Sequence, residues 1–481
     1  MKKSLTLMLV MALFLGCRSE KKEEKMSTTE IIEETFTVAP VSGTMMESAI
    51  IYEANIRQYS PQGTFTEFTK DIPELKKLGV KIIWVMPIFP ISETKRKATG
   101  GDFVSEIKDK ATRDKMLGSY YAVSDFKKIN PEFGTIEDFR ELVKTAHSND
   151  MYVILDWVPN HTGWDHTWLK TSPEFYTKND NGEITDPLNE DGIPVGWADV
   201  ADLNYDNKDL RKEMINDMLY WVTNEEIDGF RCDVAGAVPI DFWEEAIPQL
   251  RAKKEIFLLA EAWEPELLRG ELFDMAYGWD RHHTLNHIGK EKDGAKAWNE
   301  NMQKDLDRYE KDDILMTFVT NHDENSWNGT IKERMGDAAE VLTALSYVAP
   351  GMPLIYSGQE YGLDHRLKFF EKDEIPKTKG EMWALLEKLG KLKTTSSAMH
   401  GGKNAASYQP IDCSNENVLM FERSKNGASL TFVANLTDKE QSIENKLAGK
   451  YLNYMTNEKE EYSAQTKSIT FKPWEYKILI H

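Results

Sequence analysis

The feature that most constrains the fold of this chain is a series of eight short apolar runs. Each run ends in polar or acidic residues and is followed by an amphipathic stretch, an alternation typical of βα units around a parallel sheet. We therefore predict an α/β fold, a (β/α)8 TIM barrel over residues 49–395. The predicted strands are Ala49 to Asn55, Lys81 to Pro87, Tyr152 to Val158, Asp228 to Asp233, Glu255 to Glu261, Leu272 to Tyr277, Ile314 to Thr320 and Pro353 to Gly358.

The helix between the first two strands can be predicted from its apolar spacing. Gly79 suits the left-handed residue that ends a helix, so the helix should run from Phe65 to Leu78. Its apolar positions are Phe65, Phe68, Ile72, Leu75 and Leu78.

Two further segments accompany the barrel. Residues 160–204 contain Gly, Asn, Pro and Trp with little periodicity, and an insertion of this length in a compact domain is usually functional. We predict that they form a loop subdomain after the third strand. In residues 396–481 apolar and polar residues alternate between turn residues, which predicts a C-terminal antiparallel β-sandwich domain.

The N-terminus has the pattern of an export signal. Lys2 and Lys3 precede an apolar run from Leu5 to Gly16, and residues 14–17 resemble the lipidation box of bacterial lipoproteins. We predict a signal peptide over residues 1–17, lipidation at Cys17 and a membrane anchor on the periplasmic or cell-surface side of the outer membrane. The alternative is an ordinary cleaved signal with an incidental Cys17. The charged, Ser/Thr-rich residues 18–48 are predicted to form a disordered tether.

The charge and cysteine content exclude several classes of function. Lys and Arg total 59 against 80 Asp and Glu, a net charge of −21, and no basic block is present to neutralise phosphates, so nucleic acid is not expected as a partner. Cys232 and Cys413 lie far apart without metal-ligand spacing, so neither a disulfide framework nor a zinc site is expected.

Four of the predicted strands end in residues that can carry chemistry. A TIM barrel forms its active site at the C-terminal ends of its strands, so these segments are expected to meet. A single strand that ends in Asp usually only caps the next helix, but four such ends in one barrel are a stronger signal. The segments are Asp156 to His161, Gly229 to Asp233, Ala260 to Trp263 and Thr320 to Asp323.

In this order the four segments resemble the four conserved regions of the α-amylase family of glycoside hydrolases (family 13). The resemblance covers about residues 50–395 and includes Tyr52-Glu53 and Tyr356 to Glu360. It implies a retaining enzyme, in which one carboxylate attacks the anomeric carbon and a second carboxyl group protonates the leaving oxygen.

The resemblance also implies roles for individual residues. Asp233 matches the nucleophile, and Arg231, two residues earlier on the same strand face, would keep it ionised. Glu261 matches the general acid/base, which needs a raised pKa. Asp323 matches the third carboxylate, which holds sugar hydroxyls in the transition state.

Further residues match positions that bind the sugar. His161 and His322 match histidines that hydrogen-bond it, Tyr121 matches a stacking residue, and Asp156 matches a mainly structural partner of Arg231. Tryptophans could stack on additional glucose units, although core packing explains part of them. Those in or near the predicted site loops are Trp157, Trp164, Trp168, Trp197, Trp263 and Trp327, of which we predict Trp263 as substrate-binding.

Two segments depart from the family pattern. Ala235-Gly236-Ala237 follows the nucleophile segment where many α-amylases have a Lys-His pair that helps to bind sugar and calcium. Asn160 matches a calcium ligand, and Asp199 or Asp202 could complete a site; calcium is thus possible, although the chemistry requires no cofactor. A charged loop between Pro90 and Leu117 is longer than in many relatives and could shape one end of the cleft.

The leading interpretation is an enzyme that cleaves α-1,4-glucosidic bonds in starch-like glucans or malto-oligosaccharides. Neopullulanase, α-glucosidase and transglycosylase share the same carboxylates, and other members act on sucrose, trehalose or branched glucans. A non-catalytic glycan-binding lipoprotein is the alternative from another class, since a fold can persist without its chemistry. Surface glycan-uptake proteins are possible partners of an outward-facing lipoprotein.

Overall fold

The structure of the protein is a computed structural model, which describes residues 38–481 except 190, 271 and 464. The predicted signal peptide, its Cys17 and the first part of the predicted tether lie outside the described residues. Within residues 38–481, apart from those three positions, no helix is long and apolar enough to cross a membrane.

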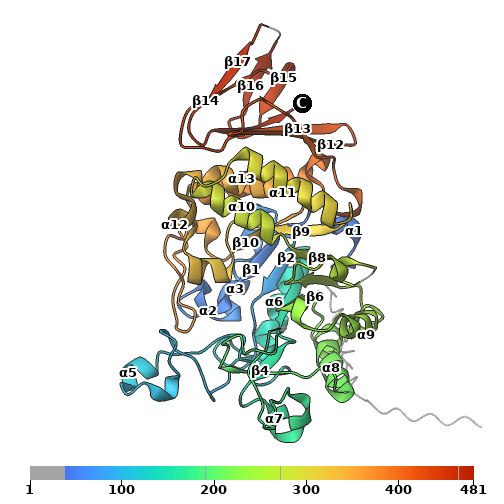
Figure 1. Cartoon of the computed structure of the whole chain (residues 1–481), viewed down its shortest axis with the longest axis vertical. Helices are drawn as coiled ribbons and strands as arrows, with labels where there is room; N and C mark the ends of the chain where they lie inside the picture. The colour runs from blue at the N-terminus through green and yellow to red at the C-terminus, as the bar shows by residue number, and fades with distance from the viewer. Residues whose placement is uncertain (1–37, 190, 271, 464) are drawn as a thin grey trace, which may run out of the picture. The chain divides into compact units, whose positions relative to one another are not determined.

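Eight parallel strands form a closed barrel, as predicted (Figure 1). Around the barrel they follow the order β1-β10-β9-β8-β7-β6-β3-β2, with each strand hydrogen-bonded to its neighbours. All eight predicted strands are present, although most are shorter than predicted at one or both ends. They are β1 (Ile51–Ala54), β2 (Ile82–Val85), β3 (Tyr152–Trp157), β6 (Gly229–Cys232), β7 (Phe257–Ala260), β8 (Met275–Tyr277), β9 (Ile314–Thr317) and β10 (Met352–Tyr356).

The two-residue period of the strands separates two cores. Alternate residues such as Ile51, Ile82 and Ile154 form one buried cluster inside the barrel, whereas their neighbours such as Ile83 and Val153 join the larger cluster beneath the helices. The same alternation decides which polar side chains face inward at the strand ends.

The helices that alternate with the strands bury one apolar face each. Helix α6, for example, begins at a capping box between Thr135 and Asp138 and buries Phe139 and Leu142. The main helices are α6 (Ile136–Ser148), α8 (Lys208–Asn224), α9 (Ile240–Arg251), α10 (Trp279–Gly289), α11 (Ala295–Arg308), α13 (Ala339–Val348) and α14 (Glu381–Thr395), and the shorter ones are α2 (Ile56–Tyr59), α5 (Lys110–Arg113) and α12 (Ile331–Met335).

The helix predicted from Phe65 to Leu78 is not continuous. It consists of α3 (Phe65–Thr69), α4 (Ile72–Leu75) and the 3-10 helix η1 (Lys76–Leu78). Pro73 has no backbone N–H to donate to the preceding turn, so a new helix starts there. The predicted end is confirmed, because Gly79 is left-handed with φ of 79°.

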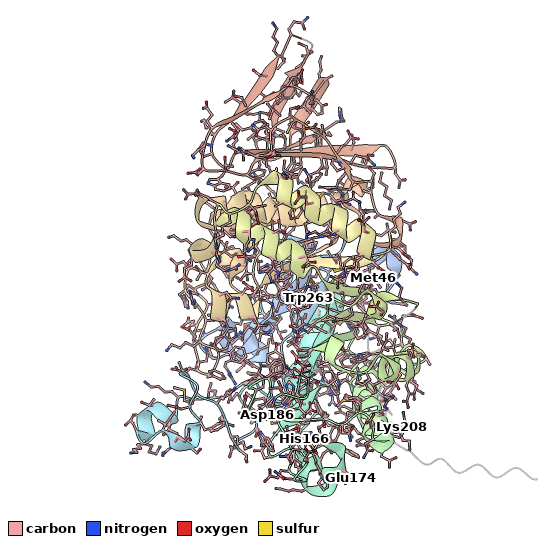
Figure 2. The ribbon with its side chains drawn as sticks, in the orientation of Figure 1. Met46, His166, Glu174, Asp186, Lys208 and Trp263 are labelled. Carbon is pink, nitrogen blue, oxygen red and sulfur yellow. The ribbon has the colours of Figure 1, made fainter. Side chains whose placement is uncertain are left out.

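The insertion after β3 forms a small subdomain. Strands β4 (His161–Gly163) and β5 (Val200–Asp202) pair antiparallel at its base, and helix α7 (Thr167–Thr171) lies between them in the sequence. Figure 2 labels His166, Glu174 and Asp186 within this insertion. The pairing of β4 with β5 returns the chain to the barrel beside the end of β3.

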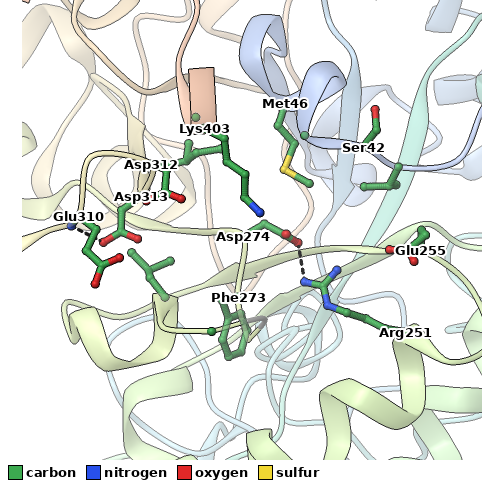
Figure 3. A pocket seen from close by; sticks show the side chains of 16 residues that line it. Ser42, Met46, Arg251, Glu255, Phe273, Asp274, Glu310, Asp312, Asp313 and Lys403 are labelled. Atoms are coloured by element: carbon green, nitrogen blue, oxygen red, sulfur yellow. Dashed lines mark hydrogen bonds and ion pairs between the residues drawn. The ribbon is translucent and has the colours of Figure 1, made fainter. Parts of the chain in front are cut away.

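Residues 43–48, which we predicted as the end of the tether, instead form helix α1 (Gly43–Ser48). The hydroxyl of Ser42 caps this helix, and Met46 packs into the inner barrel cluster. Its few apolar residues gain their burial only from the barrel, so no local pattern in the sequence marks this short segment as a helix. Beside α1, at the N-terminal ends of β7 to β9, lies a polar cavity of about 360 Å³ that contains the ion pair between Arg251 and Asp274, 3.1 Å apart (Figure 3).

The C-terminal residues form an antiparallel two-sheet domain, as predicted. One buried cluster joins apolar side chains of both sheets, including Val433 and Phe471. On the other face of the larger sheet, Phe421 and Phe432 join the main barrel cluster. The six-stranded sheet contains β11 (Gln409–Pro410), β12 (Val418–Lys425), β13 (Ala428–Asn435), β18 (Tyr476–Ile480), β15 (Gly449–Asn453) and β16 (Glu458–Tyr462), and the small sheet contains β14 (Gln441–Glu444) and β17 (Ser468–Phe471).

Candidate active site

A cavity of about 380 Å³ opens at the C-terminal ends of the barrel strands. Its lining brings together six of the predicted site residues. The six are Tyr121, His161, Asp233, Glu261, His322 and Asp323. The cavity of Figure 3 lies at the opposite ends of the strands, where TIM barrels do not place their chemistry.

Arg231 is the centre of the site. Its side chain is fully buried, and its Nη1 donates to Asp156 Oδ1 and to Asp233 Oδ1, both at 2.8 Å. Its Nη2 forms an ion pair with Glu261 Oε2 at 2.7 Å, and its Nε donates to the Tyr277 hydroxyl at 3.2 Å. One guanidinium group therefore holds three carboxyl groups that come from three neighbouring strands.

Burial sets the protonation of the two predicted catalytic carboxyl groups. It raises the pKa of Glu261 to about 7; Arg231 opposes this shift, whereas the charges of Asp233 and Asp323 add to it. Burial also raises the pKa of Asp233, to about 6, although the charge and the direct contact of Arg231 oppose this rise. Glu261 therefore keeps its proton up to about neutral pH. The neighbouring carboxyl group of Asp233 is held against the permanent cation of Arg231.

The backbone after Asp233 is strained. Val234 has φ of 46°, a left-handed conformation that a β-branched residue rarely adopts and that costs about 1–2 kcal/mol. This turn directs the Val234 N–H to Glu261 Oε2 at 2.9 Å. The strained residue therefore follows Asp233 directly and also binds the carboxyl group of Glu261.

His322 and Tyr121 form one wall of the site. The Tyr121 hydroxyl donates to Asp156 Oδ2 at 3.1 Å and lies 2.8 Å from His322 Nε2, and the two rings stack with centroids 5.5 Å apart. His322 Nδ1 contacts the buried carboxyl group of Glu53. Burial lowers the pKa of His322, but the charges of Asp323 and Glu53 outweigh burial and raise it to about 9, so His322 is an imidazolium at neutral pH.

His161 also lines the cavity and is neutral. Burial lowers its pKa to about 3, and its ring meets the indole of Trp197 edge to face with centroids 5.8 Å apart. The amide of its neighbour Asn160 lies 3.3 Å from His161 Nδ1, and Asp199, one of the two acidic residues that could complete a calcium site, pairs with Lys97. Over the described part of the chain, no three His, Cys, Asp or Glu side chains gather to hold a metal.

Asp323 and Trp263 are the more exposed predicted residues. Asp323 borders the cavity with 40% of its side chain exposed, and its Oδ2 lies 3.4 Å from His322 Nε2. Trp263 is 41% exposed but is not part of the cavity lining; its ring packs against Trp279 at 5.6 Å between centroids. Its role in substrate binding therefore stays a prediction.

The other tryptophans divide between core and cavity. Trp157 and Trp168 are buried and belong to the main core, so they are not stacking platforms. Trp197 and Trp327 line the cavity with 39% and 50% of their surfaces exposed. Trp164 packs beneath the ammonium group of Lys95.

Several site residues were not found from the sequence. Trp84 donates its indole N–H to Asp156 Oδ2 at 3.1 Å, and Phe369 and Phe370 line the cavity from the loop after β10. Lys97 reaches the same cavity from the loop after β2. Glu53 carried a usable signal, because it is an acid within an otherwise apolar strand, whereas the aromatic residues and Lys97 follow no local pattern.

The fold and the site together define the class of this protein. Paired carboxyl groups at the C-terminal ends of neighbouring strands in a closed parallel barrel, beside an open cavity, are the architecture of a barrel glycoside hydrolase.

Comparison with known proteins agrees with this class. The family model "Alpha amylase, catalytic domain" matches residues 31–187 and 193–399, and the chain belongs to the alpha-amylase family of glycoside hydrolases. It is 25% identical over 330 residues to Alpha-amylase MalA of Haloarcula japonica, a match that covers 66% of this chain and 44% of that protein. It is 27% identical over 339 residues to a 4-alpha-glucanotransferase of Thermotoga neapolitana, covering 63% of this chain and 68% of that protein.

A solved structure is similar over most of the chain. The crystal structure of an alpha-amylase from Lactobacillus plantarum aligns with a TM-score of 0.76 and 29% identity, covering 90% of this chain and 99% of that chain. The C-terminal domain is therefore included in the structural match, whereas the sequence match to MalA spans less than half of that protein.

Proposed function

We propose that this protein is a retaining hydrolase of α-1,4-glucosidic bonds in starch-like glucans or malto-oligosaccharides. The observation that carries the proposal is the single guanidinium of Arg231, which contacts Asp233 and Glu261 through its two terminal nitrogens. Two carboxyl groups on one guanidinium lie close together, and a short separation, about 5 to 5.5 Å, is typical of retaining enzymes.

The contacts support a different task for each carboxyl oxygen. Arg231 holds Oδ1 of Asp233, which leaves Oδ2 to attack the anomeric carbon. Glu261 Oε2 accepts from the Val234 N–H and pairs with Arg231, so this oxygen carries the negative character and the acidic proton belongs on Oε1. The raised pKa of Glu261 keeps that proton in place at neutral pH.

The reaction then takes two steps. In the first, Glu261 transfers its proton to the glycosidic oxygen, the bond from C1 to that oxygen breaks, and Asp233 forms an ester with C1. In the second, the Glu261 carboxylate removes a proton from water, the water oxygen bonds to C1, and Asp233 leaves as a carboxylate. Asp323 holds sugar hydroxyls in both steps, which its position at the cavity edge supports.

Product analysis with matched variants tests the proposal. The purified protein is incubated with soluble starch, pullulan and maltoheptaose, and products are followed by chromatography beside Asp233→Asn and the control Asp312→Asn. Asp312 is an exposed residue near the opposite end of the barrel, so its variant should retain wild-type turnover. Glucan cleavage that is lost only in Asp233→Asn is expected; no glucan turnover by the wild type refutes the proposal.

The same experiment separates neighbouring activities. Mid-length oligosaccharides from starch indicate endo action, panose from pullulan indicates neopullulanase, and glucose alone indicates an exo-acting glucosidase. Products longer than the maltoheptaose substrate indicate transfer to a second sugar, the activity named for the Thermotoga neapolitana relative.

We further propose that the enzyme is exported and anchored by lipid at Cys17. The support is the sequence pattern of residues 1–17. A stable anchor of this kind needs more than one acyl chain, which lipidation of an N-terminal cysteine supplies.

A further inference from the structure

Lys97 occupies an unusual position for a lysine, in the wall of the candidate active site. It comes from the charged loop after β2, and its side chain is only 21% exposed. Its Nζ donates to the Gly196 carbonyl oxygen at 3.2 Å and forms an ion pair with Asp199 Oδ1, also at 3.2 Å. The side chain of Asp199 is 8% exposed, so this pair is largely withdrawn from solvent.

The loop does not need this ion pair to contact the insertion. Lys95, in a left-handed turn with φ of 53°, places its ammonium 3.4 Å from the centre of the Trp164 ring. The backbone N–H of Glu93 donates to Asp165 Oδ2 at 2.7 Å. Because two separate contacts already fasten the loop, the charged pair in the cavity calls for another explanation.

The pair retains hydrogen-bonding capacity toward the cavity. An ammonium group has three N–H donors, and two are engaged by Gly196 and Asp199. Among the described residues, no hydrogen bond engages Asp199 Oδ2. One donor and one acceptor side by side match two neighbouring hydroxyl groups of a pyranose.

An aromatic surface lies next to the pair. Trp197 lines the same cavity, is 39% exposed, and is held edge to face against His161. An exposed indole beside paired polar groups can stack on the apolar C–H face of a sugar while the polar groups bind its hydroxyls.

We propose that a sugar-binding subsite is formed by Lys97, Asp199 and Trp197. It holds a glucose unit beyond the one whose glycosidic bond is cleaved. This proposal rests on the proposed function. The subsite uses a lysine from the loop after β2, whereas the residue after Asp233 that lines the cavity, Val234, has no polar group to bind a sugar hydroxyl.

Calorimetric binding of maltoheptaose tests the subsite without turnover. All variants are made in full-length protein that carries Glu261→Gln, so the ligand stays intact. Adding Lys97→Met should raise the Kd about ten-fold, the effect of one lost hydrogen bond from a charged donor. The control is Lys95→Met, which removes the same charge from the same loop outside the cavity and should leave the Kd unchanged.

A second variant guards against misfolding. Trp197→Ala removes an exposed side chain, so the fold should persist, and the Kd should again rise about ten-fold through lost stacking. Thermal unfolding of every variant is recorded in parallel, because a merely structural contact would lower the melting temperature and leave the Kd of the remaining folded protein unchanged.

The outcomes separate the two proposals. If wild-type protein cleaves glucans but Lys97→Met and Trp197→Ala both bind maltoheptaose like their parent, the subsite is refuted and the proposed function stands. Equal weakening by Lys95→Met also refutes it, since the effect would then follow from loop charge. If the Glu261→Gln parent fails to bind maltoheptaose and the wild type fails to cleave glucans, both proposals fail together.

Discussion

Replacement of Arg231 by methionine removes the guanidinium that contacts three buried carboxyl groups. The side chains of Asp156, Asp233 and Glu261 are 0%, 9% and 17% exposed, so water cannot replace the lost cation. Loss of one partner from a buried ion pair costs about 3–5 kcal/mol of unfolding free energy. We expect Arg231→Met to be destabilised by this amount at neutral pH.

The destabilisation should depend on pH in a defined direction. Burial raises the pKa of all three carboxyl groups in the folded protein, to about 7 for Glu261. A raised pKa contributes stability that is complete below the unfolded value and is lost as pH rises through the folded value. Arg231 lowers all three pKa values, so in Arg231→Met they should rise further. Each additional proton bound by the folded protein makes its unfolding free energy fall more steeply with pH, by about 1.4 kcal/mol per pH unit.

Urea unfolding at constant ionic strength between pH 5.5 and 8 measures this effect. The deficit of Arg231→Met relative to wild type should be smaller at pH 5.5 than at pH 8. Arg57→Met is the control, because Arg57 is also buried but contacts the Gly118 carbonyl oxygen and one partly exposed carboxylate, Glu132. Its deficit should not change over this range. An equal, pH-independent deficit in both variants would refute the electrostatic explanation.

Three further predictions concern protonation, metal and location. The kcat/KM should fall above about pH 7 as Glu261 loses its proton. Glu261→Gln should lack this alkaline limb of the pH profile and lose about 10²- to 10⁴-fold in rate. If the variant keeps the same alkaline limb, the limb belongs to another group. Prolonged incubation with EDTA should leave starch hydrolysis unchanged, because Asp199 pairs with Lys97 and no acidic cluster surrounds Asn160 among the described residues. A loss of activity that added calcium restores would contradict this prediction. Cys17→Ala expressed in a bacterium that lipidates exported proteins should move from the detergent-extracted membrane fraction to the soluble fraction, whereas retention in the membrane fraction would exclude a lipid anchor at this residue.

The sequence by itself determined the barrel and indicated the candidate reacting residues. Strands buried on both faces are marked by apolar runs of fixed length, a local property that does not depend on what the strands contact. Asp233 and Glu261 could be found in the same way, because each ends such a run and the family resemblance adds its role. Their convergence on one cavity follows from barrel closure, which brings the strand ends together.

The tertiary structure decided the features that depend on distant contacts. Lys97 lies in a charged loop that resembles an ordinary solvated segment, and only the packing of that loop against the insertion directs its ammonium group to Asp199. Trp263 follows Glu261 by two residues, yet its ring packs on Trp279 instead of lining the cavity. Helix α1 gains its burial from the barrel interior. Local periodicity records which face of an element is buried, whereas the partner of each side chain depends on residues far away in the sequence, and the chain must fold before those partners meet.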